Sequence, residues 1–61
     1  ININTAGVNE LLTLPGIGES KANAIIAYRN DNGGFKKIED IMNISGIKEA
    51  AFNKIKEKIC V

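Results

Sequence analysis

The chain has 61 residues, 44% of them apolar, and its eight basic and seven acidic side chains leave a net charge of only +1. This length allows one small domain. One cysteine and no histidine exclude an internal disulfide and an ordinary Cys/His zinc site, so apolar packing alone must hold the fold. The charge is too small for a diffuse polyelectrolyte grip on nucleic acid, so any phosphate would be held by individually placed groups. No apolar run approaches the roughly 20 residues that a membrane span needs.

The first predicted element is a short helix. Asn4 or Thr5 is expected to cap it by accepting a free backbone N–H. Pro15 and Gly16 end it, because proline lacks an N–H and glycine permits a positive φ. Its apolar stripe consists of Val8, Leu11 and Leu12.

The second predicted element is a longer helix that starts near Glu19 or Ser20. The run Asp-Asn-Gly-Gly at 31–34 is a strong stop signal, because glycine commonly follows the last residue of a helix. Its apolar face consists of Ala22, Ile25 and Ile26, widened by Ala24, Ala27 and Tyr28.

Two further helices are predicted in the second half, where Phe35 is expected to fill the core as the chain turns back. A short third helix carries Ile38, Ile41 and Met42, with Lys37 as a poor cap. A final helix from about Lys48 to Cys60 buries Phe52, Ile55 and Ile59, with Cys60 as a packing residue near its end. No segment shows the alternation of a strand, so the fold class is all-α.

The chain repeats itself at a spacing of 30 residues. Five residues of the first half meet identical residues in the second: Gly16, Ile17, Glu19, Asn23 and Ile25 match Gly46, Ile47, Glu49, Asn53 and Ile55. Apolar also falls on apolar at positions 8, 11, 12, 14 and 22. We therefore expect one domain over 1–61 with two units, about 5–33 and 35–60, related by a pseudo-two-fold axis.

The turn at 14–18 (LPGIG) predicts an anion site. A glycine-bounded turn that leads into a helix exposes several backbone N–H groups, and the helix dipole adds positive potential there. Glycine lets a phosphate come close because it has no Cβ. In the second copy Lys48 replaces the second glycine, so the close approach to the backbone is lost and a positive charge is supplied instead. Glycine and proline also end helices for purely structural reasons, so it is the repetition that favours function. The predicted contacts are Gly16, Ile17, Gly18, Ser20 and Lys21 in the first turn, and Gly46, Ile47 and Lys48 in the second.

Catalysis is not expected. No histidine can act as a general base, and the scattered carboxylates form no pair or metal cluster, so we predict no enzyme, cofactor, metal or small-molecule substrate. Lys54, Lys56 and Lys58 are interpreted as a solvated face rather than a binding stripe. Too few aromatic residues are present for a base-stacking platform.

These patterns resemble a known family. The run L-x-x-LPGIG-x-x-x-A-x-x-I at 11–25 is similar to the helix-hairpin-helix motif of DNA repair and recombination proteins. The segments ININTA at 1–6, YR at 28–29, NGGF at 32–35 and IED at 38–40 resemble the competence DNA-receptor (ComEA-type) domain over essentially the whole chain.

The resemblance implies a double helix-hairpin-helix of four or five short helices that binds double-stranded DNA without sequence preference during DNA uptake in transformation. It also implies an outward-facing receptor held to the membrane by a segment that precedes the present chain, with the domain itself a monomer. Two alternatives stay open. One is a structural or protein-interaction module on the same fold, which the low charge favours, and the other is the DNA-targeting domain of a repair enzyme.

Overall fold

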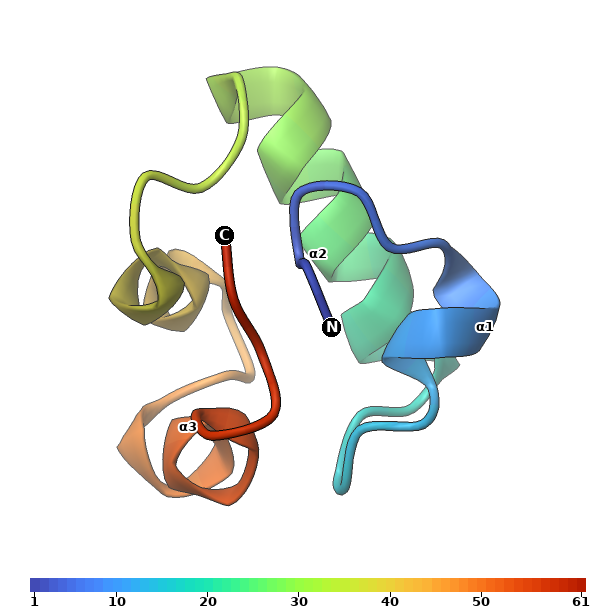
Figure 1. The fold of residues 1–61 in the computed structure, drawn as a ribbon, viewed down its shortest axis with the longest axis vertical. Coiled ribbons are helices and arrows are strands. Elements are labelled where there is room, and N and C mark those ends of the chain that lie inside the picture. The colour runs from blue at the N-terminus through green and yellow to red at the C-terminus, as the bar shows by residue number, and fades with distance from the viewer.

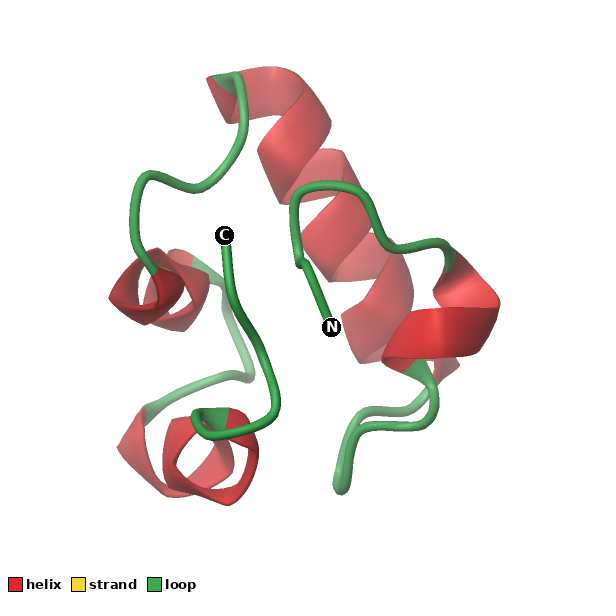
Figure 2. Cartoon of the chain, in the orientation of Figure 1, coloured by secondary structure: helices red, strands yellow, loops and turns green.

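The computed structural model describes all 61 residues and contains four helices and no strand. In chain order these are α1 (Val8–Leu11), α2 (Glu19–Asn32), the 3-10 helix η1 (Ile38–Asn43) and α3 (Glu49–Ile55). Helix α1 packs beside α2 and η1 beside α3, with the two chain ends between these pairs (Figure 1). The expected all-α fold with four or five short helices is confirmed, and loops join all elements (Figure 2). No helix has both the length and the apolar character to cross a membrane.

The two short leading helices, α1 and η1, start in the same way. The carboxylate of Glu10 accepts the N–H of Gly7 at 3.4 Å, and that of Asp40 accepts the N–H groups of Lys36 and Lys37 at 3.0 and 3.4 Å. Glu10 and Asp40 are equivalent in the 30-residue repeat. As expected, Lys37 provides no side-chain cap, but Asp40 satisfies its amide instead.

The predicted cap of the first helix was wrong. Gly7, not Asn4 or Thr5, precedes α1, because the Asn4 side chain is used on another part of the chain. The Asn4 side chain accepts the N–H of Phe35 at 2.6 Å and donates to its carbonyl at 3.0 Å. The predicted apolar stripe also held only in part, since Leu11 is buried but Leu12 is 38% exposed.

Helix α2 begins at Glu19, as expected, and ends at Asn32, where Gly33 follows in the left-handed conformation. It buries Ala22 and Ile25, whereas Ala27, predicted on its apolar face, is exposed. Near its end the Arg29 guanidinium donates to the carbonyls of Ile3 and Ala6 at 3.0 and 2.6 Å. Arg29 therefore holds the amino-terminal segment against α2.

The final helix is shorter than predicted. Helix α3 ends at Ile55 rather than near Cys60, and Cys60 is exposed rather than packed. The reason is pairing between the chain ends: Ile3 N–H donates to the Cys60 carbonyl at 2.9 Å and Cys60 N–H to the Ile1 carbonyl at 2.8 Å. These bonds make an isolated parallel bridge between Asn2 and Cys60. Ile59 is still buried, as expected, because the extended tail lies over the core.

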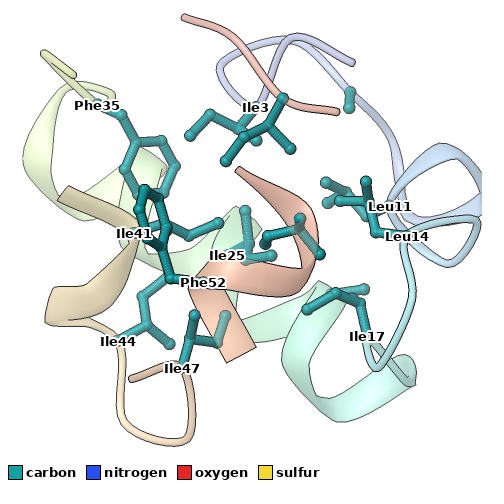
Figure 3. Packing of buried hydrophobic residues seen from close by; sticks show 14 residues of the cluster. Ile3, Leu11, Leu14, Ile17, Ile25, Phe35, Ile41, Ile44, Ile47 and Phe52 are labelled. Atoms are coloured by element: carbon teal, nitrogen blue, oxygen red, sulfur yellow. The ribbon is translucent and has the colours of Figure 1, made fainter. Parts of the chain in front are cut away.

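One apolar cluster fills the molecule and takes residues from every element and from both tails (Figure 3). No polar or charged residue is buried in it. Phe35 is 4% exposed, which confirms its predicted place, and the ring of Tyr28 stacks on it at 5.0 Å. The 14 buried residues are Ile3, Ala6, Leu11, Leu14, Ile17, Ala22, Ile25, Phe35, Ile41, Ile44, Ile47, Phe52, Ile55 and Ile59.

The double hydrogen bond of Asn4 gives a test of this arrangement. Asn4→Ala leaves both backbone groups of the buried Phe35 without these partners, so we expect the free energy of unfolding to fall by about 1–3 kcal/mol in urea titrations. Asn30→Ala is the matched control on the exposed face of α2, and we expect it to change stability by less than about 0.5 kcal/mol. Equal effects of the two variants on the free energy of unfolding would contradict a stabilising role for the two hydrogen bonds of Asn4.

Candidate nucleic-acid interface

The two predicted turns have the same backbone. We name residues 14–18 the first turn and residues 44–48 the second turn. Ile17 N–H donates to the Leu14 carbonyl at 3.2 Å, and Ile47 N–H donates to the Ile44 carbonyl at 3.1 Å. Both turns lie toward the same end of the molecule (Figure 1). The sequence repeat is therefore a structural repeat at these turns.

Two buried isoleucines anchor the turns. Ile17 is 5% exposed and Ile47 is fully buried, and Figure 3 shows both within the core. Their side chains cannot touch a ligand, so their part in the predicted site is to hold the backbone in place. The other predicted contact residues are exposed or half-buried at the surface: Gly16, Gly18, Ser20, Lys21, Gly46 and Lys48.

The two glycines of the first turn have different structural roles. Gly16 has φ of 78° and its equivalent Gly46 has 94°, a conformation that side chains rarely adopt, so both are required by the backbone. Gly18 has an ordinary extended φ of −93°, close to the −112° of Lys48 in the second turn. A Cβ on Gly18 would meet nothing within 4 Å. The fold does not require glycine at position 18. The absence of a side chain there leaves the backbone open to approach from solvent.

Free amides surround that opening. The first hydrogen bond into α2 runs from Ala22 N–H to the Gly18 carbonyl at 2.9 Å, which leaves the N–H groups of residues 18–21 without a backbone acceptor. No side chain caps the helix. Helix α2 has 14 residues, so its dipole adds positive potential where these donors face solvent. The second turn has the same arrangement ahead of the bond from Phe52 N–H to the Lys48 carbonyl at 2.8 Å, with a shorter helix behind it.

A lysine of the other unit lies beside each turn. Lys21, a predicted contact of the first turn, has its Cε 3.8 Å from the position that a Cβ on Gly46 would take, so the end of its side chain lies beside the second turn. Lys54 lies beside the first turn, with its Cδ 4.0 Å from the corresponding position at Gly16. Lys48 is exposed, and its ammonium donates to the Met42 carbonyl at 3.4 Å.

Lys54 was not among the predicted contacts, because a run of lysines on a final helix is more often a solvated face than a binding stripe. It lies 38 positions after Gly16 in the sequence. Only the packing of the two halves brings it to the first turn. The structure shows no pocket at the turns.

Comparison with known proteins agrees with this geometry. A family model described as "Helix-hairpin-helix motif" matches residues 1–60. The chain belongs to the helix-hairpin-helix family. Among curated proteins, this helix-hairpin-helix chain is 57% identical over all of its 61 residues to ComE operon protein 1 of Bacillus subtilis, which confirms the resemblance to the ComEA-type domain. It is also 48% and 46% identical, again over its whole length, to endonuclease/exonuclease/phosphatase family domain-containing protein 1 of Xenopus laevis and of Homo sapiens.

These relatives are longer proteins. The chain spans 30% of the Bacillus subtilis protein and 11% of each vertebrate protein. Segments similar to this helix-hairpin-helix chain therefore occur within longer proteins of different kinds.

The contrast between Gly16 and Gly18 predicts unequal effects of substitution on stability. Gly16→Ala forces a side chain into the left-handed region, so we expect the free energy of unfolding to fall by about 1–2 kcal/mol. Gly18→Ser keeps an extended backbone and adds a preferred capping residue, so we expect a change of less than about 0.5 kcal/mol. Thermal or urea unfolding measures both. A large loss with Gly18→Ser would mean that the fold, not a ligand, requires this glycine.

Proposed function

We propose that this chain binds double-stranded DNA through its backbone phosphates and without sequence preference. The observation that carries the proposal is that two equivalent turns each present unpaired amides, with an exposed glycine or lysine at the entrance and a lysine alongside. Amides and ammonium groups are the donors that phosphate prefers, and they act here without a large net charge. Two such turns at one end of the molecule suit two phosphates of one duplex.

The chemistry of the turns supports recognition of phosphate rather than of bases. Their apolar side chains Ile17 and Ile47 are buried, and no aromatic side chain lies at the turns. Tyr28 and Phe35 stack on each other, which leaves no aromatic platform for an unpaired base. Base edges are read by polar side chains in a groove, and the turns offer mainly backbone.

The wider role follows from the relatives. We propose that the chain is one tandem domain, with units of about 5–33 and 35–60, that acts as a monomer in a DNA receptor for uptake during competence. The similarity to ComE operon protein 1 of Bacillus subtilis supports this role. A membrane tether facing outward would then lie in another part of the full protein, and the domain itself would be non-catalytic.

A second candidate is the DNA-targeting domain of an enzyme. The vertebrate relatives support it, because their name places an endonuclease/exonuclease/phosphatase family domain in the same protein as a segment that matches this chain. Both candidates use the same phosphate-binding face, so they differ in the full-length protein and not in the mechanism of the turns.

Salt dependence tests the proposed function. We expect the chain to bind two fluorescent duplexes of unrelated sequence with equal affinity in anisotropy titrations. The affinity should fall with salt, with a log–log slope of about −0.9 for every phosphate contacted, hence about −2 or steeper if each turn holds one phosphate. Binding that distinguishes the two duplexes, or no binding at about 50 mM salt, would overturn the proposal.

A paired lysine variant tests the site. Lys21→Ala with Lys48→Ala removes two charges beside the second turn, so we expect affinity to fall at least tenfold at about 50 mM salt while the folded structure persists. Lys36→Ala with Lys56→Ala removes the same charge away from the predicted contacts and should change affinity less than threefold. Circular dichroism checks the fold of both variants. Equal losses of affinity in the two double variants would mean that the overall charge of the chain, and not the proposed site, determines binding.

A further inference from the structure

We propose that Lys54 is a further DNA-contacting residue, and that each phosphate site is built from both units of the repeat. Lys54 of the second unit completes the site at the first turn, and Lys21 of the first unit completes the site at the second turn. This inference rests on the proposed function and adds to it a residue and an exchange of lysines between the turns.

The positions of the two side chains carry the inference. The Cδ of Lys54 lies 4.0 Å from the point where a Cβ on Gly16 would stand, and its ammonium is only two bonds further along the chain. The Cε of Lys21 lies 3.8 Å from the corresponding point at Gly46, one bond from its ammonium. Each lysine therefore brings its charge within reach of an anion held on the amides of the opposite unit.

Neither ammonium has a hydrogen-bond partner within the chain. Of the ammonium groups near the turns, only that of Lys48 makes a hydrogen bond within the chain. Lys54 is exposed, and its ammonium is left free to pair with an external anion. A lysine stem that lies across a glycine turn gives up side-chain freedom, and a bound phosphate would offset that cost.

The exchange is not a trivial result of the repeat. The 30-residue equivalents of Lys21 and Lys54 are Ala51 and Ala24, so the two lysines stand at different places in their units. Lys21 lies in the first turn of α2 and Lys54 in the last turn of α3, yet one lysine reaches each glycine turn. One lysine of the opposite unit thus lies beside each turn, and Lys48 adds a further charge at the second turn only.

The matched pair Lys54→Ala and Lys56→Ala tests Lys54 on the whole chain. The two residues are two positions apart, so their side chains point to different sides of the helix. Each substitution removes one positive charge. With a fluorescent duplex at about 150 mM salt, we expect Lys54→Ala to weaken binding about fivefold and to reduce the salt slope by about 0.9. Lys56→Ala should change affinity less than twofold, and Lys54→Arg, which keeps the charge, should stay within twofold of the unsubstituted chain.

The exchange itself is tested in a Gly18→Val background, where the side chain blocks the first turn only. There we expect Lys54→Ala to lose its effect, to less than twofold, while Lys21→Ala still weakens binding about fivefold. Thermal unfolding of each variant checks that the fold is kept. The opposite coupling, with Lys21→Ala silenced instead, would show that each lysine serves its own turn.

The outcomes separate the two levels of the proposal. If the unsubstituted chain binds DNA but Lys54→Ala behaves like Lys56→Ala, Lys54 is no contact and only this inference fails. If the unsubstituted chain does not bind a duplex even at about 50 mM salt, the proposed function fails as well.

Discussion

The shared apolar core is the constraint on which the rest of the structure depends. A chain of this length without disulfide or metal cannot give each helical unit its own core, so the two units must bury their faces against each other. Ile17 and Ile47 belong to the same buried cluster, one from each turn. Packing therefore fixes the turns relative to one another, and the exposed face that they form is a consequence of the core.

Short helices leave many backbone groups without helical partners, and the fold satisfies several of them from distant segments. Asn4 pairs with both backbone groups of Phe35, and Arg29 takes the carbonyls of Ile3 and Ala6. The chain ends pair through the bridge between Asn2 and Cys60. These bonds close the molecule around its core, and they use polar side chains that would otherwise be free for ligands. In contrast, the amides at the start of α2 stay free.

Burial of one residue and exposure of its neighbours let a nearly neutral domain present the donors that the proposed phosphate contacts need. Ile17 is buried, the N–H groups of residues 18–21 that follow it have no backbone acceptor, and the position at Gly18 is open. Glu19 and Glu49 follow the two turns and stabilise the helix starts through the helix dipole. Because these two side chains are negative, the local positive potential comes from the backbone amides and from the lysines placed beside the turns. Placement, rather than total charge, makes the face suitable for DNA.

The sequence by itself determined the features that depend on neighbouring residues: the helical class, the 30-residue repeat, the glycine turns, and the start and end of α2. Local hydrogen bonding and backbone preferences decide these. Only the tertiary structure decided which residue caps α1, why α3 stops at Ile55, and which turn the ends of Lys21 and Lys54 lie beside. Asn4, Cys60 and Lys54 each act on a segment more than 30 residues away, and no local pattern reports a contact that exists only after the two units pack.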